Sequence, residues 1–194
     1  MAHSSSPFAE TGYAARSFAE RHDAVCAGRR GEERYSLSPR TFASAPRGTR
    51  IVLPSPNGAS LSLGTGHVTT LSACLRNATS VAREAQRVGK RITVIAAGER
   101  WPDGQLRPAV EDLLGAGAVV STLGGRRSPE AEAGQRAFEA TAPRLREALL
   151  GSASGRQLIE WGFADDVDLA AAWDVSDCAP VLVDSAFRAS ASNE

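Results

Sequence analysis

Residue types that bind oxyanions stand directly after three predicted β-strands of this 194-residue chain. In open α/β sheets, ligands bind beyond the carboxyl ends of the strands. Backbone amides, arginine and asparagine suit phosphate or sulfonate oxygens, so the pattern predicts a site for a small anionic ligand. The residues are Ser55, Asn57 and Gly58 after strand 50–53, Arg76 and Asn77 after strand 68–74, and Gly98, Glu99 and Arg100 after strand 92–96.

Each of these groups also has an ordinary structural explanation. Asn57 and Gly58 can aim backbone amides at an anion, or they can form a turn followed by a helix cap. Arg76 and Asn77 can bind an anion together. Alternatively, Asn77 caps the helix expected over 77–88 and Arg76 is solvated. The residue types alone leave both alternatives open.

Two adjacent acidic residues lie in the first turn of a helix that is predicted to begin near Pro108. Glu111 and Asp112 diverge by about 100° around the helix axis, so both cannot point squarely at one ion. One of them can hold Mg²⁺, directly or through water, because this cation prefers oxygen ligands. The alternative is that both stabilise the first helical turn, where acidic side chains are favourable.

Charge and motifs argue against several other classes of protein. Lys plus Arg and Asp plus Glu are both 22, so no net field attracts the chain to nucleic acid or to an anionic membrane. No apolar run approaches the ~20 residues that span a bilayer. No HExxH, GxSxG or P-loop motif occurs. A small-molecule partner fits better, and an amphipathic helix predicted over 129–150 leaves a homo-oligomer possible.

The cysteines and the chain ends bound the location and the domain organisation. Cys26, Cys74 and Cys178 form no CxxC pair, which favours reduced thiols in a cytoplasmic protein, each filling a small space in the core. Residues 1–13 are predicted to be a disordered leader and 188–194 a tail. Residues 14–187 are predicted to form one domain.

The order of hydrophobic patterns predicts an α/β fold with three layers, α/β/α, around a mostly parallel sheet. The apolar run 92–96 is typical of a strand covered on both faces. Gly89 suits a left-handed helix end, and the small residues of 113–120 predict close packing on the sheet. Strands are expected over 24–27, 50–53, 68–74, 92–96 and 181–183, and helices over 14–21, 77–88, 129–150, 154–161 and 167–173.

Several short motifs, taken in order, resemble the 2-phosphosulfolactate phosphatase family. The similarity runs from about His22 to Val183, and it is carried by the shared order and spacing because each motif alone is short. The motifs are Leu53-Pro54-Ser55-Pro56-Asn57-Gly58, Leu75-Arg76-Asn77-Ala78, Ile95-Ala96-Ala97-Gly98, Glu111-Asp112-Leu113-Leu114-Gly115-Ala116-Gly117-Ala118 and Ser154-Gly155-Arg156-Gln157-Leu158.

The resemblance implies a magnesium-dependent phosphatase that hydrolyses 2-phosphosulfolactate to sulfolactate and phosphate, a step towards coenzyme M. It also implies that Asn57, Gly58, Arg76 and Asn77 bind oxyanions, and that Glu111 or Asp112 holds the ion. Family members usually begin with a strand ending in Asp-Val-Leu-Arg-Ala-Thr, which does not occur in this sequence before Ala14. Ala96 stands where the family commonly has Cys. The alternative is an inactive, N-terminally shortened homologue that binds small anions.

Overall fold

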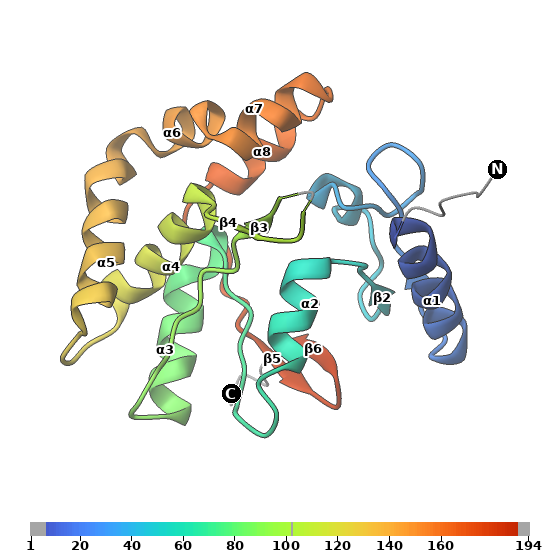
Figure 1. Ribbon diagram of the computed structural model, residues 1–194. Helices are drawn as coiled ribbons and strands as arrows, with labels where there is room; N and C mark the ends of the chain where they lie inside the picture. Colours follow the sequence, from blue (N-terminus) through green and yellow to red (C-terminus); the bar gives the residue numbers. More distant parts are fainter. Residues whose placement is uncertain (1–6, 102, 190–194) are drawn as a thin grey trace. The chain divides into compact units, whose positions relative to one another are not determined.

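The computed structural model describes residues 7–101 and 103–189 (Figure 1). The chain divides into two compact units, one up to Ala59 and one from Ser60 onward, and each is described by itself. Helix α2 (Pro56–Leu63) spans the boundary between them. The prediction of one domain over 14–187 stays a prediction. Within the described ranges, no helix is long and apolar enough to cross a membrane.

The first unit confirms a predicted helix and two predicted strands. Helix α1 (Pro7–Arg21) begins well before the predicted residue 14, inside the predicted leader, and residues 1–6 lie outside the described part. Strands β1 (Val25–Cys26) and β2 (Ile51–Val52) pair in parallel, and η1 (Pro39–Phe42) lies between them in the chain. The two strands are joined through the Val25 amide, which donates to the Arg50 carbonyl at 2.9 Å.

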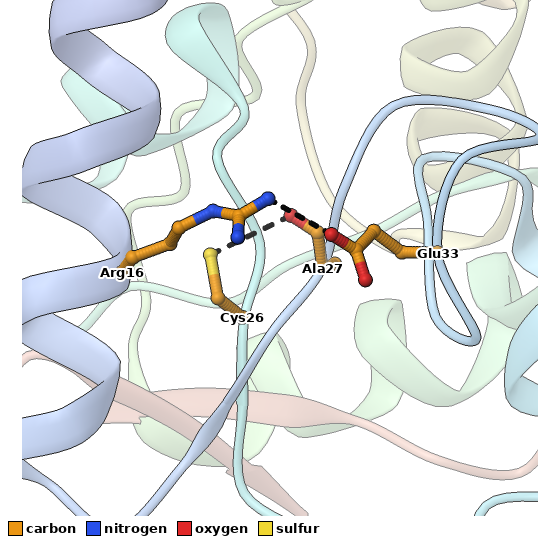
Figure 2. A network of polar contacts seen from close by, with 4 residues as sticks. All are labelled: Arg16, Cys26, Ala27 and Glu33. Carbon is orange, nitrogen blue, oxygen red and sulfur yellow. Dashed lines mark hydrogen bonds and ion pairs between the residues drawn. The ribbon is translucent and has the colours of Figure 1, made fainter.

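A small polar network lies beside β1 (Figure 2). Arg16 Nη2 is 2.8 Å from Glu33 Oε1, and the Cys26 thiol donates to the Ala27 carbonyl at 3.6 Å. Both charged side chains are largely exposed, so this ion pair contributes little to stability. Burial raises the pKa of Cys26, which favours the protonated form of its thiol. Cys74 is exposed, so the prediction that every cysteine fills the core is wrong.

The core of the second unit is built by helices. The helical segments are η2 (Leu75–Asn77), α3 (Ala78–Val88), α4 (Val110–Thr122), α5 (Pro129–Thr141), η3 (Ala142–Arg144), α6 (Leu145–Gly151), α7 (Ala153–Glu160) and α8 (Ala164–Ala171). Leu114 of α4 is 1% exposed at the centre of a cluster that also contains Phe138, Leu149 and Val167. Helix α4 packs against both α3 and α5 (Figure 1).

The close packing of α4 depends on glycine, but its partner is a helix. A Cβ atom built on Gly117 would overlap the backbone carbonyl of Gly134 in α5 and come within 2.8 Å of the Phe138 Cβ. The prediction that small residues pack α4 onto a sheet is therefore wrong for Gly117. The helix predicted over 129–150 is also divided, because Pro143 cannot donate in the helical ladder, and the backbone leaves the helical conformation at Arg144, where φ is −130° and ψ is 32°.

The strands of the second unit form two separate antiparallel hairpins. β3 (Glu99–Arg100) pairs with β4 (Leu106–Arg107), and β5 (Pro180–Val183) pairs with β6 (Ala186–Ala189). With the parallel pair of the first unit, these sheets fit the α/β class. The described residues do not confirm the three-layer arrangement or the mostly parallel sheet, which stay predictions.

Two predicted strands of the second unit are not formed as expected. Residues 92–98 are assigned no strand, and Ile95 is 59% exposed, so the prediction of a strand covered on both faces is wrong. In 68–74, only an isolated bridge forms, between Leu71 and Val181. Gly89 follows α3 as predicted, but its φ of −157° is extended rather than left-handed.

Candidate active site

The segment before β4 and the start of α4 bring four of the predicted site residues together: Gly98, Glu99, Glu111 and Asp112. Gly98 precedes β3, and its φ of +70° is a conformation that side chains rarely adopt. A Cβ at Gly98 would also come within 2.8 Å of Leu106 Cδ1, across the hairpin. A hydrogen bond from the Gly98 backbone lowers the pKa of the Asp112 carboxyl group. Glu99 follows directly on β3.

The electrostatics of this cluster are dominated by Asp112. Its side chain is half-buried in the first turn of α4, and this burial raises its pKa to about 6. The negative charges of Glu111 and Glu99 add to the increase. The Gly98 amide and the positive charge of Arg107 act in the opposite direction, but the increase prevails. A carboxyl group with this pKa can be charged or neutral within the pH range of many enzymes.

Arg107 joins this cluster, although the sequence argument did not select it. It lies on β4 directly opposite Glu99 of β3. Its guanidinium carbon is 5.6 Å from the centre of the Trp101 ring, and its Nη2 donates to Ser154 Oγ at 3.2 Å. A usable signal was present in the sequence, because Asp103-Gly104 is a turn pair that would fold 105–107 back on 99–101. Looking only at residues that follow a predicted strand did not select Arg107, because no strand was predicted directly before it.

Arg100 has a local role in the same hairpin. Its Nη1 donates to the Gly104 carbonyl at 2.8 Å, and the side chain is exposed. The Trp101 amide donates to the Gln105 carbonyl at 2.8 Å, which closes the hairpin above it. Arg100 therefore lies on the same hairpin as the cluster, but one of its N–H donors is used by the Gly104 carbonyl of the turn.

Arg76 and Asn77 hold segments of the second unit together. Arg76 Nη1 donates to the Leu169 carbonyl of α8 at 2.7 Å. The buried Asn77 accepts from the Cys74 amide at 2.8 Å and donates to the Cys178 carbonyl at 3.1 Å and the Ser72 carbonyl at 3.4 Å. Asn77 stands at the start of α3 as predicted, but its side chain makes no cap hydrogen bond to that helix. It binds instead to the loops before α3 and after α8.

Ser55, Asn57 and Gly58 lie around the first turn of α2, and they are assigned to the first unit. The Ser55 carbonyl accepts from the Ala59 amide at 3.2 Å, and the Ser55 amide donates to the Leu53 carbonyl at 2.8 Å. Asn57 and Gly58 are therefore helical residues, and the prediction of a tight Asn-Gly turn is wrong. Their position in the first turn agrees with the alternative of amides near a helix start.

A cavity elsewhere in the second unit is lined mainly by apolar groups. It has a volume of about 490 Å³ and lies beside the edge-to-face pair Phe138 and Trp173, whose ring centres are 5.1 Å apart. Its other lining residues are Ser121, Glu139, Ala142 and Pro143. None of the predicted site residues lines it. The cluster around Asp112 has the better chemistry for a charged ligand, because it combines carboxylates, an arginine and a backbone amide.

Comparison with known proteins agrees with the motif order. The chain matches the family model described as 2-phosphosulpholactate phosphatase over residues 9–185. It is 30% identical over 166 residues to the 2-phosphosulfolactate phosphatase of Methanothermobacter thermautotrophicus. This alignment covers 82% of this chain and 69% of that relative. It is 32% identical over 134 residues to a probable 2-phosphosulfolactate phosphatase of Gloeobacter violaceus. This alignment covers 69% of this chain and 55% of that relative.

Proposed function

The chain belongs to the 2-phosphosulfolactate phosphatase family, a family of hydrolases, and on this premise we propose that it hydrolyses 2-phosphosulfolactate or a similar small acidic phosphate ester. The products would be sulfolactate and phosphate. The structural observation that supports this proposal is the cluster of Asp112, Glu111, Glu99 and the Gly98 amide. It joins groups that can bind a cation with a donor suited to an oxyanion.

Mg²⁺ is part of this proposal, with Asp112 or Glu111 as the carboxylate that would hold it. The described residues contain no group of three or more His, Cys, Asp or Glu that could hold a metal ion. Mg²⁺ does not require one, because it commonly takes one or two carboxylates together with waters and substrate phosphate. The carboxylates near Asp112 suit a bound cation for a second, electrostatic reason. Glu111 and Glu99 raise the pKa of Asp112, and a cation would offset this repulsion. The bound ion would neutralise charge on the phosphate oxygens.

The remaining predicted residues support substrate binding in the proposal to different degrees. Gly98 and Glu99 share the cluster with Asp112, and Arg100 lies on the same hairpin. Asn77 already uses its side-chain oxygen and nitrogen within the protein, so its proposed contribution is to shape the loops rather than to donate to the ligand. Ser55, Asn57 and Gly58 belong to the first unit, and the proposed site at Asp112 does not include them.

The experiment is phosphate release from racemic 2-phosphosulfolactate and from phospholactate, with Mg²⁺ and with EDTA. We expect release that depends on Mg²⁺ and that Asp112→Asn lowers by at least about 100-fold, since removing one charged group at a phosphoryl-transfer site commonly has effects of this order. Glu160→Gln is the matched control, because Glu160 is an exposed carboxylate at the end of α7.

Three outcomes would contradict parts of this proposal. No phosphate from either ester would refute the phosphatase function of the chain. Equal release in EDTA would refute the role of Mg²⁺. Full activity of Asp112→Asn would refute the placement of the site at the start of α4, while leaving the activity itself in place.

A further inference from the structure

Arg107 is a half-buried cation whose positive charge lies near the Asp112 carboxylate. In the described part of the chain, its guanidinium forms no ion pair, although Glu99 stands directly opposite it in the hairpin. Arginine carries five N–H donors. One of them is directed to the neutral Ser154 hydroxyl at 3.2 Å, which leaves most of the donor fork available.

The surroundings of Arg107 hold its guanidinium in place from two sides. The Trp101 ring lies against it, with 5.6 Å between the ring centre and the guanidinium carbon. An aromatic face attracts a cation and leaves the in-plane N–H donors free to point elsewhere. Ser154 comes from the first turn of α7, so the contact also ties the hairpin to a helix far away in the sequence.

Other arginines of the second unit have a structural role and differ from Arg107 in the groups to which they donate. Arg127 directs its donors to backbone carbonyls, including those of Val120 at 3.2 Å and Gly125 at 3.5 Å, where it covers the end of α4. Arg76 likewise donates to a carbonyl at the end of α8. Such arginines satisfy exposed helix ends. Arg107 contacts no backbone carbonyl among the described residues and lies beside the acidic cluster instead.

We propose that Arg107 binds the phosphoryl group of the substrate, and that Trp101 and Ser154 are positioning residues that hold its guanidinium in place. This inference rests on the proposed phosphatase function. A planar guanidinium matches two oxygens of a phosphate, and a fixed cation stabilises charge on the transferring group. The neighbouring carboxylates supply the complementary part of the site, where the cation would bind. Arg107 therefore completes a site that otherwise holds mostly negative charge.

The test measures affinity for inorganic phosphate by calorimetry with Mg²⁺ present, beside kcat and KM for the ester. We expect Arg107→Ala to weaken phosphate binding by about 10- to 100-fold, the usual range for a hydrogen bond to a charged group. Arg107→Lys should recover only part of the affinity, because lysine keeps the charge but loses the fork. Arg83→Ala is the control, since Arg83 is an exposed arginine on α3.

The positioning residues have a different expected signature. Ser154→Ala and Trp101→Leu should each weaken phosphate binding by about two- to tenfold, since they leave the charge of Arg107 in place. Circular dichroism of each variant checks that the chain is folded. If both variants bind phosphate as tightly as the unaltered chain does, Ser154 and Trp101 have no positioning role.

The outcomes separate this inference from the proposed function. If the ester is hydrolysed and Arg107→Ala binds phosphate within twofold of the unaltered chain, the role of Arg107 is wrong and the function stands. If no ester is hydrolysed but phosphate binding depends on Arg107, the function is wrong and the binding residue stands. Sulfolactate affinity is measured by the same calorimetry. If Arg107→Ala weakens the binding of sulfolactate but not of phosphate, Arg107 holds the sulfonate end, and the phosphoryl assignment is overturned.

Discussion

Gly117 and Gly115 of α4 allow one chemical change to be tested in two opposite environments. Both glycines lie inside the same helix, two positions apart. A Cβ on Gly115 would meet no atom within 4 Å, whereas one on Gly117 would overlap the carbonyl oxygen of Gly134. Alanine is favoured over glycine in a helix interior by about 1 kcal/mol. Gly115→Ala should therefore increase the free energy of unfolding by up to ~1 kcal/mol.

The same gain at Gly117 is outweighed by crowding between α4 and α5. The overlapping atoms include a backbone oxygen of a helix, and the Phe138 Cβ is only 2.8 Å from the added carbon. Neither is the end of a flexible side chain, so the helices must move apart. Overpacking costs ~1–3 kcal/mol, and the rigid neighbours place this site near the upper end. After the helix-propensity gain, Gly117→Ala should destabilise the second unit by about 2 kcal/mol.

The assay is thermal and urea unfolding followed by tryptophan fluorescence, because Trp101, Trp161 and Trp173 all lie in the second unit. For a chain of this size, 1 kcal/mol corresponds to about 2–4 °C in Tm. Gly117→Ala should therefore lower Tm by about 4–8 °C, while Gly115→Ala raises it slightly. A Gly117→Ala protein as stable as the Gly115→Ala protein would refute the close contact between α4 and α5.

Two further predictions concern polar residues of the second unit. In EDTA, Asp112→Asn should be more stable than the unaltered chain by about 1–2 kcal/mol at pH 8. The folded pKa of Asp112, about 6, lies above its ordinary value of 3.8, so stability contributed by the protonated form is lost as the pH rises between these values. Urea titrations from pH 4 to 8 check this, and an advantage that does not shrink towards pH 4 would contradict it. Asn77→Ala should destabilise the second unit by about 2–3 kcal/mol, because the buried amide makes three hydrogen bonds to loop backbone. An unchanged Tm with reduced phosphate affinity would instead identify Asn77 as a ligand residue.

Local sequence signals located most helices and the strands β1, β2 and β5, but they did not predict β3, β4 or β6. Helices α3 and α5 begin close to the predicted residues 77 and 129, and α4 begins close to the predicted Pro108. The pairing of strands could not be predicted as well from the sequence, because a run such as 92–96 has strand-forming side chains whether or not a partner strand lies beside it. Ile95 is exposed because of which segments pack around it, and the residues of 92–96 do not determine this by themselves.

Family membership, and the choice of Glu111 and Asp112 as candidate site residues, came from the sequence, because the motif order is a linear property. Only the tertiary structure decided which of these residues meet. The β3–β4 hairpin brings Arg107 opposite Glu99, and it places the Gly98 backbone where it acts on the pKa of Asp112. The raised pKa of Asp112 likewise depends on burial and on charges from other elements. Such interactions fall off with distance in space, and residue order alone does not fix that distance.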